Sequence, residues 1–181
     1  MHTFTVYVED RPGVLNRVAS LFRRRGFNIY SLAVGHSETP GVSRMTVVVQ
    51  TDPGGAQRIK AHLYKLIHVV RVDDITEVPA IIRDLALIKV SADAQSRPSL
   101  LQLAEVFGAR VVDVAPASIV IEMAGSEAKI DGLLDVLRPH GVLEMVRTGR
   151  VAMARGVGSR TASAGPAAGI PDAEADVSYS V

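Results

Sequence analysis

The fold is decided by residues 3–34, which read TFTVYVEDRPGVLNRVASLFRRRGFNIYSLAV. At its start Phe4, Val6 and Val8 alternate with Thr3, Thr5 and Tyr7, which is the period of a strand with one buried face. The alternation stops at the polar turn 9–13, after which apolar residues recur on one face of a helix. These are Val14, Leu15, Val18, Leu21 and Phe22. We therefore expect a strand, a tight turn, a helix that ends at Gly26 and a second strand that begins beside Asn28.

The turn before this helix is suited to a small anion. The first amides of a helix lack internal partners and carry the positive end of its dipole, and Gly13 lets a ligand approach closely. A carboxylate held by the amides of Gly13 to Leu15 would leave an ammonium group for the Asp10 carboxylate or the Asn28 amide oxygen. This arrangement predicts an amino-acid site. The simpler alternative is that Gly13 serves only the turn and Asn28 only caps a bend, and spacing alone favours it.

The following residues complete one structural unit. Strands are expected over 27–34 and 42–50, joined by a polar loop, and a fourth strand over 69–75. A second helix is expected between the third and fourth strands, where apolar residues recur with helical spacing at Ile59, Leu63, Leu66 and Ile67. The order strand, helix, strand, strand, helix, strand is that of ferredoxin-like folds, in which both helices cover one face of an antiparallel sheet.

The same pattern then starts again. From Ile82 a strand is expected, followed by a helix over 99–107, strands over 110–114 and 119–122, a helix over 127–138 and a strand over 142–147. The fold class is therefore α+β with two ferredoxin-like βαββαβ domains, at 1–78 and 79–156. Residues 157–181 contain mainly Gly, Ser, Ala, Pro and Asp without an apolar period, so we expect a disordered tail.

Composition excludes several classes of partner. The 20 basic and 19 acidic residues leave a formal net charge of +1, which gives no broad field for nucleic acid or anionic lipid. The absence of cysteine excludes disulfides and thiolate sites, and no apolar run approaches the roughly 20 residues of a membrane helix. We expect a cytoplasmic protein whose core consists mainly of Val, Ile, Leu and Ala.

Catalytic and metal chemistry is weakly represented. The five histidines lie in different predicted elements, and His62 and His68 are expected to be exposed or capping. No Gly-x-Ser-x-Gly motif occurs, and Gly54-Gly55 lacks the Lys-Ser/Thr of a phosphate-binding loop. Three arginines at 23–25 fit the negative end of a helix better than a nucleic-acid surface. We expect no catalytic residue and no metal ligand.

Three short motifs carry a resemblance to a known family. Residues 9–15 read EDRPGVL, residues 25–29 read RGFNI and residues 43–46 read SRMT. Together they resemble the ACT domain of the small, regulatory subunit of acetolactate (acetohydroxyacid) synthase. The resemblance runs from residue 2 to about residue 156. Many members have Asn where this chain has Asp10.

The resemblance implies a regulatory subunit. It would bind the large catalytic subunit of acetolactate synthase, raise its activity and transmit feedback inhibition by a branched-chain amino acid, most often valine. The large subunit would hold thiamine diphosphate, Mg²⁺ and FAD. In this family ACT domains pair side by side, as a homodimer or higher oligomer, with the effector at the seam. The implied effector-binding residues are Asp10, Pro12, Gly13, Val14 and Leu15 of one protomer and Asn28 and Ile29 of the other.

Two other functions remain open from the sequence. One is a free-standing ACT-domain amino-acid sensor that regulates a different enzyme or a transcription process. The other is a small enzyme whose site the motifs do not reveal. Arg44 lies in the most specific motif, and the only roles that the sequence suggests for it are a salt bridge or a contact with the backbone.

Overall fold

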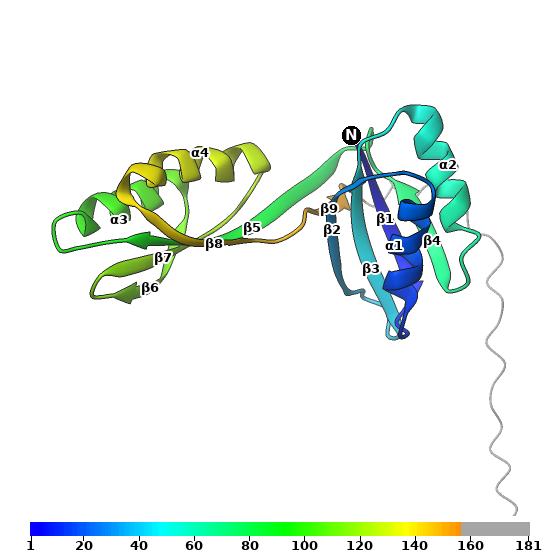
Figure 1. Ribbon diagram of the computed structural model, residues 1–181, viewed down its shortest axis with the longest axis horizontal. Helices are drawn as coiled ribbons and strands as arrows, with labels where there is room; N and C mark the ends of the chain where they lie inside the picture. Colours follow the sequence, from blue (N-terminus) through cyan, green and yellow to red (C-terminus); the bar gives the residue numbers. More distant parts are fainter. Residues whose placement is uncertain (157–181) are drawn as a thin grey trace, which may run out of the picture.

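Two sheets, each covered on one face by two helices, lie along the long axis of the molecule in Figure 1. The computed structural model describes residues 1–156, so the expected disordered tail at 157–181 lies outside the described residues. The two predicted βαββαβ units are both present, which confirms the fold class.

The first unit contains β1 (His2–Glu9), α1 (Val14–Arg24), β2 (Ile29–His36), β3 (Val42–Val49), α2 (Pro53–Leu63) and β4 (Val69–Asp74). Its antiparallel sheet has the order β2-β3-β1-β4, so β2 and β4 form its edges. The alternating residues of β1 and the apolar stripe of α1 meet in one core. Its members include Phe4, Val6, Val8, Val14, Val18, Leu21, Phe22, Met45, Ile59 and Leu63.

The second helix is shorter than its apolar spacing predicts. Asp52 caps its start, where the Asp52 carboxylate accepts a hydrogen bond of 2.6 Å from the Gly55 amide. The helix ends at Leu63, and the chain then turns through His68, which has a φ of 77°. Ile67 was predicted on the buried stripe, and this was wrong, because its side chain lies beyond the helix and is 73% exposed.

The second unit contains β5 (Ala80–Ser91), α3 (Arg97–Phe107), β6 (Arg110–Ala115), β7 (Ser118–Gly125), α4 (Glu127–Leu137), the 3₁₀ turn η1 (Arg138–His140) and β8 (Val142–Arg147). Its sheet has the order β6-β7-β5-β8. The core again lies between the sheet and its helices. It includes Ala86, Ile88, Val90, Leu100, Ile119, Ile121, Ile130, Leu133 and Leu137.

A two-stranded ribbon connects the two units. Ala80–Arg83 of β5 pair with a short strand, β9 (Val151–Ala154), while the rest of β5 belongs to the second sheet. The sequence pattern did not predict β9. Arg44 of β3 donates a hydrogen bond to the backbone carbonyl of Ala152, so the backbone contact foreseen for Arg44 is confirmed and fastens this ribbon to the first sheet.

Candidate functional site

The turn between β1 and α1 has unfilled donors. Gly13 adopts a φ of 82°, which few side chains tolerate, and no side chain caps the helix that follows. The Val14 amide donates to the Arg11 carbonyl at 3.3 Å, and the Arg17 amide donates to the Gly13 carbonyl at 3.0 Å. In the described residues, the intervening amides of Leu15 and Asn16 have no hydrogen-bond acceptor. They are free to bind a carboxylate.

The side chains of the turn divide between core and surface. Val14 is buried in the first core, whereas Leu15 is 44% exposed, so the Leu15 side chain can contact a ligand and that of Val14 cannot. Pro12 is exposed beside Gly13, and nothing lies within 4 Å of a Cβ placed on Gly13. The turn is therefore open to solvent on the side where the free amides begin.

Charged groups around the turn are mostly paired with one another. Glu9 accepts from His68 at 2.9 Å and pairs with Arg11 at 2.7 Å. Asp10 lies 3.5 Å from the imidazole of His36, at the end of β2. His68 was expected to be exposed or capping, but its side chain is only 21% exposed and holds Glu9 in place. Asp10 remains half-exposed and can still meet an ammonium group.

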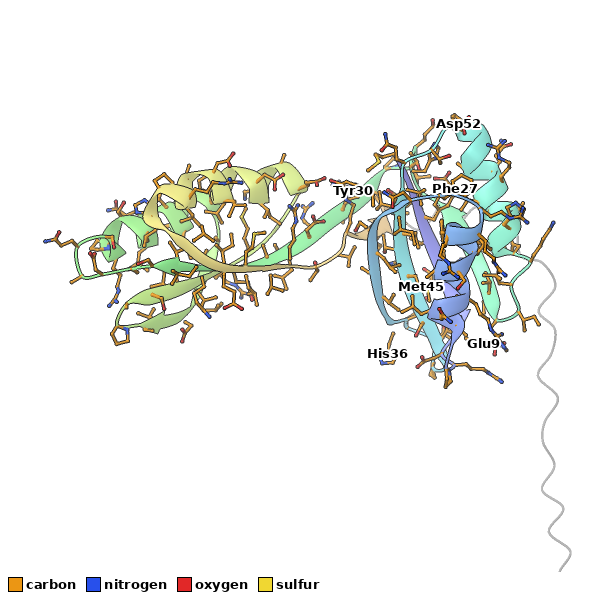
Figure 2. The ribbon with its side chains drawn as sticks, in the orientation of Figure 1. Glu9, Phe27, Tyr30, His36, Met45 and Asp52 are labelled. Atoms are coloured by element: carbon orange, nitrogen blue, oxygen red, sulfur yellow. The ribbon has the colours of Figure 1, made fainter. Side chains whose placement is uncertain are left out.

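The other two predicted residues lie at the opposite end of the domain. Asn28 is exposed just before β2. Ile29, the first residue of β2, pairs with Val49 at the end of β3, and Val49 also pairs with His2 at the start of β1. Ile29 therefore lies beside the start of β1, whereas the turn follows the end of β1. Figure 2 places Glu9 and His36 at one end of the first domain, and Phe27 and Tyr30 toward the other. Because the 11 residues of α1 separate the two groups, they stand about 16 Å apart along the helix. A single chain does not bring them together.

The corresponding turn of the second domain is closed. Between β5 and α3 the Asp93 carboxylate accepts from the amides of Gln95 at 3.0 Å and Ser96 at 2.7 Å, and from the Ser96 hydroxyl at 2.7 Å. The hydrogen bonds from the Ser96 amide and hydroxyl lower the pKa of Asp93. The two amides just before α3 are thus satisfied by the protein itself, and Pro98, the second residue of the helix, has no amide hydrogen to offer a ligand.

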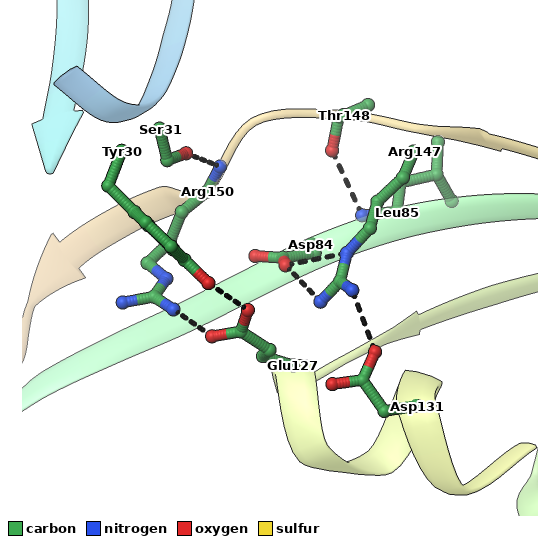
Figure 3. A network of polar contacts seen from close by, with 9 residues as sticks. All are labelled: Tyr30, Ser31, Asp84, Leu85, Glu127, Asp131, Arg147, Thr148 and Arg150. Atoms are coloured by element: carbon green, nitrogen blue, oxygen red, sulfur yellow. Dashed lines mark hydrogen bonds and ion pairs between the residues drawn. The ribbon is translucent and has the colours of Figure 1, made fainter. Parts of the chain in front are cut away.

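A polar network joins the two domains beside the start of β2, and Figure 3 shows it from close by. The Tyr30 hydroxyl donates to Glu127 at 2.8 Å, and Glu127 also pairs with Arg150. The hydrogen bond and the charge of Glu127 raise the pKa of Tyr30. Sequence spacing gives no signal for this contact, since 97 residues separate Tyr30 from Glu127.

A second part of the network stays within the C-terminal domain. Arg147 contacts Asp84 at 2.7 Å and Asp131 at 2.9 Å, and so joins β5, α4 and the end of β8. Burial opposes the charge of Arg147, but the hydrogen bonds to these two carboxylates outweigh it and raise the pKa of Arg147. These contacts fix α4 on its sheet.

Two other features bear on function. In residues 1–156, no three His, Asp or Glu side chains are grouped closely enough to hold a metal ion. None of the helices in the same part of the chain has the length and apolar character needed to span a membrane.

Comparison with known proteins identifies both domains. Residues 4–71 match the family described as the AHAS small subunit-like ACT domain, and residues 83–156 match the small subunit of acetolactate synthase. The probable acetolactate synthase small subunit of Archaeoglobus fulgidus is 47% identical over 155 residues, which are 86% of this chain and 97% of that protein. The chain belongs to the acetolactate synthase small-subunit family.

Other relatives extend the match. The acetolactate synthase small subunit of Mycolicibacterium smegmatis is 47% identical across 86% of this chain and 91% of its own length. The crystal structure of the Thermotoga maritima small subunit is 40% identical, covers 85% of this chain and 96% of its own, and superposes with a TM-score of 0.81. The resemblance inferred from the three motifs is thereby confirmed, and the chain is a regulatory subunit of acetolactate synthase.

Proposed function

We propose that this subunit activates the thiamine-diphosphate-dependent catalytic subunit and makes it sensitive to feedback inhibition by a branched-chain amino acid, with valine as the first candidate. Membership of the acetolactate synthase small-subunit family supports the binding of a catalytic large subunit. The free amides of Leu15 and Asn16 support an effector that carries a carboxylate. The protein would act in the cytoplasm, in the synthesis of valine, leucine and isoleucine.

The effector site is proposed to lie between two chains. The turn 10–15 would hold the carboxylate, and Asn28 and Ile29 of the second copy would hold the rest of the amino acid. The observation that carries this proposal is that the two groups of residues lie at opposite ends of one domain, with β2 as an edge strand of the sheet between them. Pairing of two β2 strands would join the two sheets and bring each turn to the partner's strand start.

Catalysis is assigned to the large subunit. Thiamine diphosphate, Mg²⁺ and FAD would all be bound there, as the resemblance to the family implies. The small subunit would then contribute no reacting group. Its effect on the reaction would come from binding the catalytic subunit in one of two arrangements that the effector can shift.

Reconstitution tests the proposal. The purified chain is mixed with its acetolactate synthase large subunit, and acetolactate formation from pyruvate is measured with and without valine, leucine or isoleucine. We expect higher activity than with the large subunit alone, and inhibition by at least one of the three amino acids. A large subunit whose rate is the same with and without this chain would contradict the proposal. The Gly13→Asp chain serves as the control for specific inhibition.

A further inference from the structure

The contact between the two domains begins at the residue next to the proposed effector site. Tyr30 directly follows Asn28 and Ile29, and its hydroxyl donates to Glu127 at 2.8 Å. Glu127 is the first residue of α4, in the other domain. A displacement at the start of β2 therefore reaches the second domain through one side chain.

The same contact is closed from the opposite side by the connection between β8 and β9. Arg150 pairs with Glu127 through its guanidinium, while its backbone amide donates to the Ser31 hydroxyl at 2.7 Å. Tyr30, Ser31, Glu127 and Arg150 thus form a ring that passes from β2 to α4 and back, as Figure 3 shows. We call these four residues the interdomain ring.

Backbone packing accompanies the polar contacts. A Cβ placed on Gly149 would lie 2.3 Å from the Leu32 carbonyl oxygen, so only glycine lets the connection approach β2 this closely. The ring is nonetheless not a rigid core, because Tyr30 is 54% exposed and a hollow of about 320 Å³ adjoins it. The side chains of Tyr30 and Glu127 therefore have room to break and re-form their hydrogen bond.

We propose that the interdomain ring carries the state of the effector site to the second domain, with Tyr30 and Glu127 as positioning residues. This inference rests on the proposed function, because it requires an effector at Asn28 and Ile29. When the effector holds the start of β2, the Tyr30–Glu127 hydrogen bond fixes α4 relative to the first domain. Because Arg147 at the end of β8 joins Asp131 of α4 to Asp84 of β5, the whole second domain follows.

The strength of the contact suits a switch. A single solvent-accessible hydrogen bond shifts a conformational equilibrium about two- to tenfold, which a bound effector can reinforce or oppose. A larger, fully buried interface would hold one arrangement permanently. The partial exposure of Tyr30 and the adjoining hollow therefore fit a contact that opens and closes.

The test separates binding from its consequence. Tyr30→Phe removes only the hydroxyl that reaches Glu127, and Tyr64→Phe is the matched control, since the Tyr64 hydroxyl bonds the Val72 backbone within the first domain. Valine binding is measured by calorimetry on each chain alone, and valine inhibition on the enzyme reconstituted with the large subunit.

We expect Tyr30→Phe to bind valine within about twofold of the wild type, while half-inhibition requires about two- to tenfold more valine. Tyr64→Phe should leave the ratio of the two constants unchanged. Glu127→Gln and Tyr30→Phe should act non-additively when combined. Loss of Glu127 charge should also lower the pKa of Tyr30, followed by ultraviolet absorbance, which reports the contact in solution.

Two results have different meanings. If the wild-type enzyme responds to valine and Tyr30→Phe gives the same inhibition curve, the ring does not transmit the signal and the inference is overturned. Equal shifts in Tyr30→Phe and Tyr64→Phe would overturn it as well, since they would reflect general loosening. If the wild-type chain neither activates nor responds to any branched-chain amino acid, the proposed function itself fails.

Discussion

The turn at Gly13 and the turn at Asp93 occupy the same place in the two repeats, yet they are built in opposite ways. In the second domain, the Asp93 carboxylate accepts three hydrogen bonds from Gln95 and Ser96. In the first, no carboxylate among residues 1–156 accepts hydrogen bonds from the backbone amides of the turn, and the amides of Leu15 and Asn16 have no acceptor there. One fold therefore provides a self-contained turn and an open one, and function depends on the difference.

The largest expected effect comes from closing the open turn. Gly13→Asp places a negative charge where the effector carboxylate should bind, and should weaken valine binding about ten- to a hundredfold, or about 1.5–3 kcal/mol. Gly13→Asn is the matched control, because Asn has the same shape and also tolerates a positive φ. Calorimetry should show a clearly smaller loss for Asn. Equal losses would mean that shape or strain, rather than charge, is responsible.

Removing the polar side chain proposed to bind the effector from the other protomer should have a smaller effect on valine affinity. Asn28→Ala deletes one polar group from an exposed position outside the core, and should weaken valine binding about two- to tenfold without loss of stability. Circular dichroism at increasing temperature checks the fold. Wild-type affinity in a folded Asn28→Ala chain would remove Asn28 from the site.

The converse change opens the closed turn. Asp93→Ala leaves the amides of Gln95 and Ser96, just before α3, without their acceptor, so the second domain should melt a few degrees lower. Valine affinity should stay within about twofold of the wild type, because the Gly13 turn is untouched. A large loss of valine binding in this variant would contradict the division of roles between the two turns.

The smallest expected effect is the pH dependence of the stabilisation by Asp93. Because hydrogen bonds lower the pKa of Asp93 in the folded protein, its stabilisation is complete above the ordinary pKa of about 3.9 and is lost as the pH falls through the folded value. The difference in melting temperature between wild type and Asp93→Ala should therefore be constant from about pH 5 to 8 and shrink below about pH 4. A constant difference down to pH 2 would exclude the carboxylate as its source.

Local patterns predicted the elements of both domains well. The alternation of Phe4, Val6 and Val8 faces the core in the structure, and so does the stripe from Val14 to Phe22 except for Leu15, which is exposed. Helices and strands of this kind are predictable because the apolar period lies within one short segment of sequence and does not depend on contacts with distant segments. The helix end at Leu63 was missed because the apolar spacing continues to Ile67 after the hydrogen-bonded helix has stopped.

Contacts between distant segments were not predictable in the same way. Strand β9 has only four residues, too few for a period, and forms because β5 extends beyond its own sheet. The contacts of Arg44 with Ala152 and of Tyr30 with Glu127 depend on how the ribbon places the domains. The seven predicted effector residues remain a prediction, since one chain holds them in two separate groups.

Complementation between two defective chains tests most directly whether the effector site is shared. Gly13→Asp and Asn28→Ala chains carrying different tags are co-expressed, mixed dimers are isolated through both tags, and valine binding is titrated. In a shared site, one of the two seams combines both changes and the other combines neither, so we predict one site of wild-type affinity per mixed dimer. Mixed dimers in which every site remains weak would contradict the account, because each site would then lie within a single chain.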